Sequence, residues 1–357
     1  MRIGVDARGM VNHADGRIAG VSQFTSAIIQ AMQAIGTDKI ILCNETGRSH
    51  LPIVSNHLQF SAAVHRIHPD VFFSPTGLLP LGLKVPSVAF IHDVFILKHP
   101  EWFPDSLWQR LFTLRVVLPA TMRSARRLIV PSECVRRDLI EAFPQSEKKI
   151  FVVSEGVVMQ DRSSLPLTDA IRERLSIRSP YMLTVSTLEP RKNFLVALNA
   201  FARVLKDHPN FQYVIAGKRG WKDASILSAI DELNKRYPGS VCYVGAVSED
   251  DKHMLYANAE LYLSTSLAEG FGLPVFEAMA HGVPVIATPV GAIPDLAEGC
   301  VEVIPSDDTL ATQQAISRLL RDPEKRQSLQ KKGYDVIAHL TWRETAYRIV
   351  QVLYETV

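Results

Sequence analysis

Short β-branched runs alternate with helical patterns along most of the chain, and this alternation limits the fold more than any other feature. In the first half, runs typical of strands occupy residues 3–6, 40–43, 71–73, 88–92, 128–130 and 150–153. A second series follows at residues 181–186, 213–216, 241–244, 261–264 and 284–288. Strands that alternate with helices form parallel sheets covered by helices. The sequence therefore predicts α/β architecture with two doubly wound, Rossmann-like domains.

The length of 357 residues also favours two domains, because one hydrophobic core rarely serves a chain this long. The periodicity weakens and polar residues accumulate between residues 159 and 180, where we expect the interdomain linker. Residues 1–160 are then the first domain and residues 161–341 the second. A last helix within residues 342–357 is expected to pack back on the first domain and complete it.

The composition excludes several classes of protein. Hydrophobic residues make up 47% of the chain and charged residues 21%, which is typical of soluble globular proteins. The 39 basic and 37 acidic residues nearly balance, so no nucleic acid partner is expected. The four cysteines are scattered without a metal or disulfide pattern, which predicts no metal site and fits a reducing compartment. With no signal peptide and no membrane-spanning run, we expect a cytoplasmic protein whose membrane contact is peripheral.

Residues 269–284 join a glycine-rich loop to a short apolar helix pattern. Gly270 and Gly272 let the loop approach a ligand closely, and the backbone N–H groups of a helix start form an anion site. Phosphate is the expected ligand. Glu269 on the loop and Glu277 on the helix suit sugar hydroxyls, with ribose at Glu277 and a hexose at Glu269. The structural alternatives are an acid that favours the helix start and an acid that faces solvent.

Other candidate residues also follow predicted strands, and ligands of open α/β sheets bind outside the carboxyl ends of the strands. Arg191 and Lys192 lie between a strand and a helix, where adjacent cations suit a diphosphate, although a solvated basic turn is the simpler reading. His92 closes an apolar run, a position more often taken by a structural histidine. The loop of residues 16–20 matches neither the dinucleotide fingerprint nor the P-loop, which disfavours a dehydrogenase and an ATP-binding protein.

Together these motifs resemble the retaining glycosyltransferases of family 4, which have the GT-B architecture of two Rossmann-like domains facing a cleft. The resemblance runs over nearly the whole chain. Its most specific part is residues 269–274 with Glu277, which match the family's two glutamates separated by seven residues. Supporting matches are the Gly20 loop, residues 91–93, residues 130–133, residues 244–259 and the helix that begins at Trp342.

The resemblance implies a role for each matching position. The catalytic residues would be Glu269 beside the transferred sugar, His92 approaching that sugar from the first domain, and Arg191 and Lys192 on the diphosphate. The donor would also contact Gly20, Gly270, Phe271, Gly272, Leu273 and, through its ribose, Glu277. Many relatives carry an arginine where this chain has Thr187, so Arg191 is expected to supply that charge.

The implied reaction is transfer of a hexose with retention at the anomeric carbon, with no metal and no cofactor besides the donor substrate. The form of residues 190–193 resembles that of members that use GDP-mannose, so we expect mannose transfer to a saccharide or lipid-linked saccharide, in cell-surface polysaccharide or glycolipid assembly. Two alternatives stay open: a GT-B sugar-nucleotide epimerase and a non-catalytic sugar-nucleotide-binding subunit. The apolar and basic residues 102–127 either touch an anionic membrane, at the cytoplasmic face, or form a core-facing helix.

Overall fold

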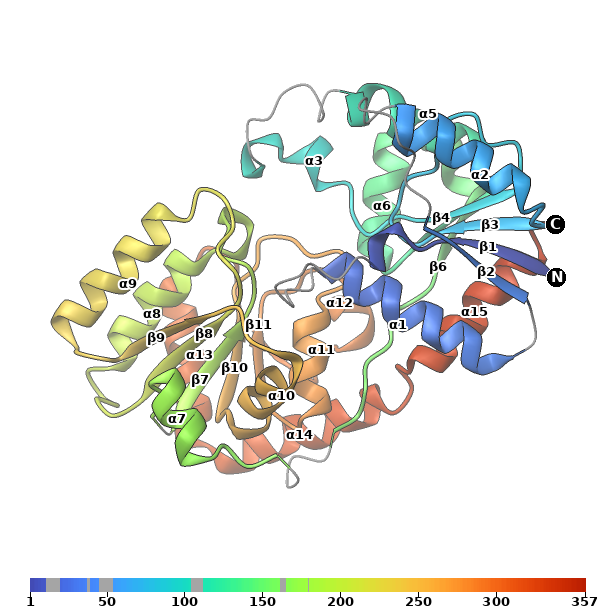
Figure 1. Ribbon diagram of the computed structural model, residues 1–357. Helices are drawn as coiled ribbons and strands as arrows, with labels where there is room; N and C mark the ends of the chain where they lie inside the picture. The colour runs from blue at the N-terminus through green and yellow to red at the C-terminus, as the bar shows by residue number, and fades with distance from the viewer. Residues whose placement is uncertain (11–19, 37–38, 45–53, 104–111, 161–164, 179) are drawn as a thin grey trace. The chain divides into compact units, whose positions relative to one another are not determined.

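The computed structural model describes residues 1–357 except residues 11–19, 37–38, 45–53, 104–111, 161–164 and 179 (Figure 1). The chain divides into two compact units. Unit 1 consists of Met1–Pro100, Asp105–Gly156 and Leu340–Val357, and unit 2 of Glu101–Pro104 and Val157–His339. Each unit contains one parallel sheet with helices on both faces. The prediction of two doubly wound α/β domains is thereby confirmed.

The sheet of unit 1 has the strand order β2-β1-β3-β4-β5-β6 among the described residues. Its strands are β1 (Arg2–Asp6), β2 (Lys39–Cys43), β3 (Val71–Ser74), β4 (Ser87–Phe90), β5 (Arg127–Val130) and β6 (Ile150–Val152). The central strands β3 and β4 are buried along their whole length. Strands buried on both faces are mostly apolar, which explains why these two sequences show no alternation of apolar and polar residues.

Helices cover both faces of this sheet. The helices of unit 1 are α1 (Gly20–Ile35), α2 (Phe60–Arg66), α3 (Phe95–Lys98), α5 (Leu118–Ser124), α6 (Glu133–Ala142) and α15 (Trp342–Tyr354), with the short helices η1 (Arg8–Met10), η2 (Val54–Gln59), η4 (Thr113–Val117) and η5 (Pro144–Lys149). The short helix η3 (Pro100–Trp102) begins in unit 1 and continues into the residues of unit 2. One face packs against α1 and α15, and the other against α2, α5 and α6.

The last helix, α15, returns to unit 1 as predicted and lies beside α1 (Figure 1). Its apolar residues Ala346, Ile349 and Leu353 are fully buried in the same core as β1 and α1. At its far end Arg126 donates to the carbonyl of Thr356 at 2.9 Å. Cations near the last carbonyls of a helix stabilise it. One arginine of the expected membrane segment therefore has a structural role; residues 104–111 of that segment lie outside the described part.

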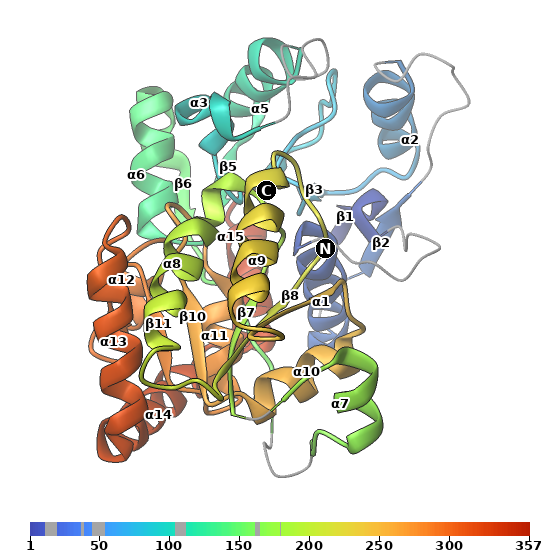
Figure 2. The same ribbon diagram turned by 90° about the vertical axis from the view of Figure 1, so that its left-hand side faces the viewer.

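The sheet of unit 2 has the strand order β12-β11-β10-β7-β8-β9 among the described residues. Its strands are β7 (Tyr181–Val185), β8 (Gln212–Ala216), β9 (Val241–Gly245), β10 (Leu261–Ser264), β11 (Val285–Ala287) and β12 (Glu302–Val303). Its helices are α7 (Asp169–Leu175), η7 (Pro190–Lys192), α8 (Phe194–Val204), α9 (Ala224–Arg236), α10 (Glu249–Asn258), α11 (Leu273–Ala280), α12 (Ile293–Leu296), α13 (Thr309–Arg321) and α14 (Pro323–Ile337). Helices α8, α9 and α13 cover one face and α10 and α11 the other (Figures 1 and 2).

The stretch expected to be a linker, residues 159–180, differs from the expectation because it contains α7. Arg174 of this helix forms an ion pair with Asp251 of α10 at 2.6 Å. The polar sequence reflects an exposed helix docked through charged contacts, which weakens the apolar periodicity that reveals a helix.

Among the described helices, none is long and apolar enough to cross a membrane.

Candidate active site

The strand order of unit 2 places two loops side by side at one edge of its sheet. The chain runs from β7 outward through β8 and β9, then returns to the other side of β7 to form β10. Ligands of open α/β sheets bind where the strand order reverses in this way, in the crevice outside the carboxyl ends of the two central strands. Residues 186–193 follow β7 and residues 265–272 follow β10. The structure thus brings together the two motifs that the sequence analysis singled out.

Hydrogen bonds fasten these two loops to each other. Thr265 donates through its hydroxyl to the carbonyls of Lys192 and Asn193 at 3.0 and 3.1 Å. The backbone N–H of Leu267 donates to the carbonyl of Arg191 at 2.8 Å. The backbones of both motifs are therefore held in fixed register, and their side chains converge.

Glu269 receives donors from both predicted phosphate-binding cations. Lys192 Nζ lies 2.5 Å from Oε1, and Arg191 Nη1 lies 2.9 Å from Oε2. Ser266 adds its hydroxyl to Oε1 at 2.7 Å. Arg191 uses its other terminal nitrogen for Glu189 Oε1 at 2.6 Å. From the sequence, the cations and Glu269 were expected to bind different parts of a donor, whereas here they form one partly buried network.

Charge pairing decides the protonation state of Glu269. Burial alone would raise the pKa of this carboxyl, but Lys192 and Arg191 outweigh burial and lower its pKa to about 2. Burial lowers the pKa of Lys192 despite its pairing with Glu269. At neutral pH Glu269 is therefore an ionised, hydrogen-bonded carboxylate that has no proton to give to a leaving group.

The start of α11 lies beside this network. Gly272 occupies the N-cap position with φ of +95°, in the left-handed region that favours glycine. As a glycine, this N-cap residue has no side chain to cap the first turn of the helix, which begins at Leu273. The N–H groups of an uncapped helix start carry a partial positive charge, so Gly270, Phe271, Gly272 and Leu273 lie where a phosphate would be stabilised.

Glu277 lies further along α11 and has partners on α10. Lys252 Nζ lies 2.9 Å from Oε1, and the Tyr256 hydroxyl donates to Oε2 at 3.0 Å. His281 follows the helix, and its Nδ1 lies 2.7 Å from the Glu277 carbonyl. The two carboxylates of the motif consequently occupy separate surroundings, as the sequence analysis expected.

His92 belongs to unit 1 and follows β4. Its Nε2 lies 2.8 Å from the carbonyl of Pro75, and its Nδ1 lies 3.5 Å from Glu155 Oε1. Burial would lower the pKa of His92, but Glu155 and the Pro75 carbonyl outweigh burial and raise it. The ring also contacts Phe24 edge-on, with centroids 4.8 Å apart. Both ring nitrogens thus have partners within unit 1. This geometry is also what a histidine with a purely structural role would show.

Gly20 is the first residue of α1 and is exposed. The rest of the predicted loop, residues 16–19, lies outside the described residues.

Five side chains around Glu269, Glu277 and His92 were not identified from the sequence as functional residues: Glu155, Glu189, Lys252, Tyr256 and Ser266. The sequence could have predicted that Lys252 and Tyr256 act together, because residues four apart on a helix share one face. Glu155 carried none, since nothing in the sequence pairs it with a histidine 63 positions earlier.

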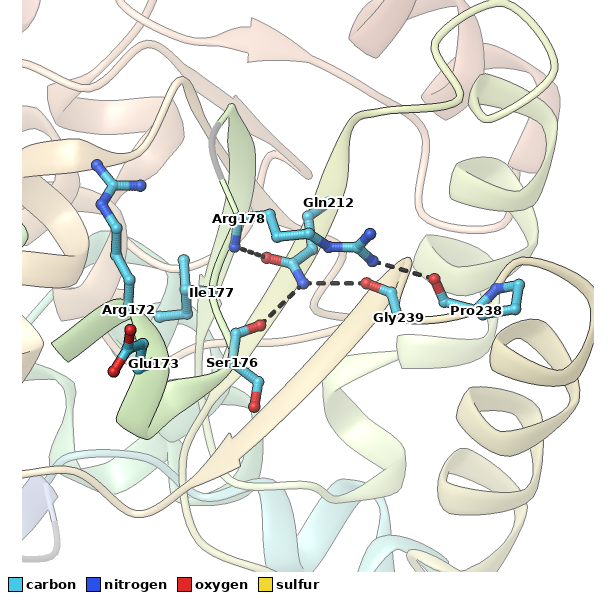
Figure 3. Close-up of a pocket in the computed structure, with 8 residues that line it drawn as sticks. All are labelled: Arg172, Glu173, Ser176, Ile177, Arg178, Gln212, Pro238 and Gly239. Carbon is cyan, nitrogen blue, oxygen red and sulfur yellow. Dashed lines mark hydrogen bonds between the residues drawn. The ribbon is translucent and has the colours of Figure 1, made fainter. Parts of the chain in front are cut away.

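A separate cavity of about 520 Å³ lies at the opposite, amino-terminal edge of the same sheet (Figure 3). Gln212, the first residue of β8, accepts from the Arg178 N–H at 2.7 Å and donates to the carbonyl of Gly239 at 3.0 Å. Arg178 in turn donates to the carbonyl of Pro238 at 3.0 Å. These hydrogen bonds connect Gln212 with the residues just before β7 and β9. The polar residues that line the cavity therefore stabilise this edge of the sheet.

Over the described residues, no group of three or more His, Cys, Asp and Glu side chains is placed to hold a metal ion.

Two family models match the chain. The Glycosyltransferase Family 4 model matches residues 18–161, and the Glycosyl transferases group 1 model matches residues 168–336.

The O-antigen chain mannosyltransferase B of Escherichia coli is 26% identical over 276 residues, 76% of this chain and 71% of that protein. The O-antigen chain mannosyltransferase RfbU of Salmonella typhimurium is 22% identical over 332 residues, 85% of this chain and 88% of that protein. The serotype-specific mannosyltransferase WbdA of Escherichia coli is much longer: a 28% identical match covers 58% of this chain but 26% of WbdA.

Solved structures share the fold. Sucrose-phosphate synthase from Thermosynechococcus elongatus superposes with a TM-score of 0.72 at 19% identity, covering 99% of this chain and 98% of that one. HepE of Anabaena, solved in complex with UDP and glucose, gives 0.69 at 16% identity over 99% of this chain and 100% of its own. The predicted GT-B fold is thereby confirmed. With one family model on each unit and this fold across both, the chain belongs to the retaining glycosyltransferases of family 4.

Proposed function

We propose that this enzyme transfers mannose from GDP-mannose, with retention, to a saccharide or lipid-linked saccharide during cell-surface polysaccharide or glycolipid assembly. The observation that carries the proposal is the network of Arg191, Lys192 and Glu269 beside the start of α11. Similarity to two O-antigen chain mannosyltransferases supports mannose as the sugar and a polysaccharide as the product.

In this proposal Arg191 and Lys192 bind the donor diphosphate together with the backbone of residues 270–273. Both cations are held by carboxylates, so their side chains are ordered before a diphosphate binds. Such preorganisation matters because negative charge grows on the leaving diphosphate as the donor bond breaks. Lys192 supplies a point charge, and Arg191 a planar group suited to two oxygens.

Glu269 then lies beside the transferred hexose, where positive charge develops on the ring carbon. An ionised carboxylate stabilises that charge, and its pairing with two cations makes it a poor nucleophile. The departing phosphate oxygen is the base that takes the acceptor's proton on the same face. His92 contributes from unit 1 by contact with the hexose, and Gly20 lets the first loop approach the donor phosphates.

The donor is tested by thermal-shift measurements with GDP-mannose, UDP-glucose and ADP-glucose at matched concentrations. A ligand that binds only the native state raises its stability. We expect the largest rise with GDP-mannose, and a larger rise with UDP-glucose would overturn the choice of base and sugar. HepE was solved with UDP and glucose, which makes the UDP-sugar the informative competitor.

The acceptor side is tested with donor labelled in the mannose. Transfer of label to a lipid-linked saccharide, with the anomeric configuration kept, is the expected result. Release of free nucleotide with the label in free sugar and none on an acceptor would favour the epimerase alternative, and absence of both activities would favour a non-catalytic subunit.

Peripheral membrane association belongs to the same proposal. Cosedimentation with vesicles that contain anionic lipid measures it, and binding that falls with added salt is expected for a basic surface. No binding to such vesicles would remove the membrane from the proposal.

A further inference from the structure

Lys252 is buried beside the proposed donor site, although no role was expected for it from the sequence. We propose that Lys252 is a positioning residue which, together with Tyr256, holds the Glu277 carboxylate in the orientation that binds the hydroxyls of the donor's ribose. The inference rests on the proposed function, because it assigns the ribose to Glu277.

The geometry of α10 and α11 carries the inference. Lys252 and Tyr256 are four residues apart on α10 and therefore project from one face of that helix. Lys252 Nζ lies 2.9 Å from Glu277 Oε1, and the Tyr256 hydroxyl lies 3.0 Å from Oε2. Because each carboxylate oxygen receives one of these donors, the pair fixes the plane of the carboxylate and not only its position.

Each of the two donors is itself rigidly held. Tyr256 is fully buried, and its ring stacks on His281 with centroids 5.1 Å apart. Lys252 is 7% exposed and also contacts Glu249 Oε2 at 2.9 Å. The long lysine side chain thus loses its freedom between two carboxylates. A carboxylate held in this way has already lost its conformational freedom, so less entropy is lost when a ribose binds.

Stability alone does not account for the buried pair. Replacing a buried ion pair by apolar side chains of similar volume is often neutral or stabilising, because desolvation offsets the attraction. If Lys252 only packed α10 against α11, methionine at this position would stabilise the contact equally well. What methionine does not provide is a donor that orients Glu277.

The charges around Lys252 agree with this reading. Burial would lower the pKa of Lys252, but Glu277 and Glu249 outweigh burial and raise it. The ammonium therefore stays charged at neutral pH and remains a donor to Glu277. The nearby His281 has a pKa lowered mainly by burial, so it is a neutral ring that adds no competing positive charge.

The test compares nucleotides that differ only in a ribose hydroxyl. Dissociation constants of GDP and 2′-deoxy-GDP, and in parallel of UDP and 2′-deoxy-UDP, are measured by calorimetry on the full chain. A site that hydrogen-bonds a hydroxyl through a charged group is expected to bind the ribonucleotide roughly 10–100 times more tightly. In Lys252→Met this preference should fall to within about threefold, while binding of the deoxynucleotide changes little.

Four further variants allow the result to be interpreted. Glu277→Gln should lose the preference as well, and Lys252→Arg should keep most of it because the charge and donor remain. Lys235→Met is the matched control, since Lys235 is exposed on α9. Lys252→Gln retains a neutral donor, so it gives an intermediate preference and replaces Lys252→Met if circular dichroism shows that the latter is unfolded.

The possible failures are distinguishable. Equal binding of ribo- and deoxynucleotide by the wild type, or a wild-type preference in Glu277→Gln, would contradict the proposed ribose role of Glu277 itself. A preference that disappears in Glu277→Gln but survives in both Lys252→Met and Lys252→Gln would overturn the role of Lys252 and leave the ribose assignment standing.

Discussion

Glu269 is the residue whose surroundings constrain the chemistry most. Its side chain is only 12% exposed, and its carboxylate meets two cations and a hydroxyl within 2.9 Å. The pairing lowers the pKa of Glu269 to about 2 and so keeps it ionised at neutral pH. A residue in this state can stabilise a developing positive charge, but it is unsuited to donate a proton.

The same pairing makes a prediction about acid stability. The pKa of Glu269 falls from its usual 4.5 to about 2 on folding, and a lowered pKa stabilises the native state above the unfolded value. At about 1.4 kcal/mol per pKa unit, the contribution is about 3 kcal/mol near pH 7. It should shrink as the pH falls from 4.5 toward 2, because the unfolded state then binds a proton that the native state does not.

Urea unfolding of wild type and Glu269→Gln between pH 7 and pH 3 measures this effect. The difference in unfolding free energy should be largest above pH 5 and smaller at pH 3. A difference that stays constant over this range would show that ionisation of Glu269 contributes nothing to stability.

Lys192 makes the second prediction at this scale. Loss of one charge-assisted contact to a transition state lowers turnover by about 10²–10³. Lys192→Met should therefore reduce kcat by about that factor in a donor-turnover assay, whereas Lys206→Met, which removes an exposed lysine, should leave kcat unchanged. Full activity of Lys192→Met would contradict the assignment of Lys192 to the diphosphate.

At the scale of elements, α11 carries Glu277 and begins just after the loop that carries Glu269. Its start depends on Gly272, whose φ of +95° puts an L side chain in an unfavourable region. Gly272→Ala should lower the unfolding free energy by about 1–2 kcal/mol and also weaken GDP binding, because the first N–H groups of the helix would be reoriented.

Gly299 provides the matched control for that substitution. It too has a positive φ, of +70°, and no heavy atom lies within 4 Å of the Cβ that an alanine would add. Gly299→Ala should therefore cost similar stability and leave GDP binding unchanged, as measured by urea unfolding and calorimetry. Equal losses of GDP affinity in both variants would mean that the helix start takes no part in binding.

Several elements were predictable because their signals are local. The start of α10 follows such a local rule, since the side chain of Ser248 accepts from the N–H of Asp251 at 3.1 Å. The last helix was expected within residues 342–357 and runs from Trp342 to Tyr354. Helix α7 was missed because its contacts to α10 are made by charged side chains, which leave no apolar stripe in the sequence.

The contacts of the site were less predictable for a reason that is also physical. Lys192 and Glu269 are 77 residues apart, and the strand order that places β10 next to β7 brings them together. Neither residue contains information about that order. Each motif could be found by its own pattern, but the ion pairs among Arg191, Lys192 and Glu269 required the folded sheet.

At the scale of the whole molecule, the cores of the two units share no residues. Most of the proposed nucleotide contacts belong to unit 2. GDP alone should therefore slow amide hydrogen exchange most strongly at residues 189–193, 249–258 and 270–277. A ligand present at 100 times its dissociation constant stabilises the unit that it binds by about 2.7 kcal/mol.

Hydrogen exchange followed by mass spectrometry, with and without GDP, tests this expectation. The strands β1, β3 and β4 of unit 1 serve as the internal reference, since no nucleotide contact is proposed for them. Protection confined to those strands, with none in unit 2, would place the nucleotide elsewhere.

The return of α15 to unit 1 also has a consequence for the order in which the chain acquires its structure on the ribosome. Unit 2 is almost continuous in sequence, whereas the core of unit 1 needs residues 340–357, which emerge after all of unit 2. At about 5–20 residues per second, the intervening residues 157–339 take on the order of 10–40 s to synthesise. During that interval the face of β1 and β3 that α15 later covers is open to water and to chaperones. Unit 2 can therefore fold first, although most of unit 1 is made before it.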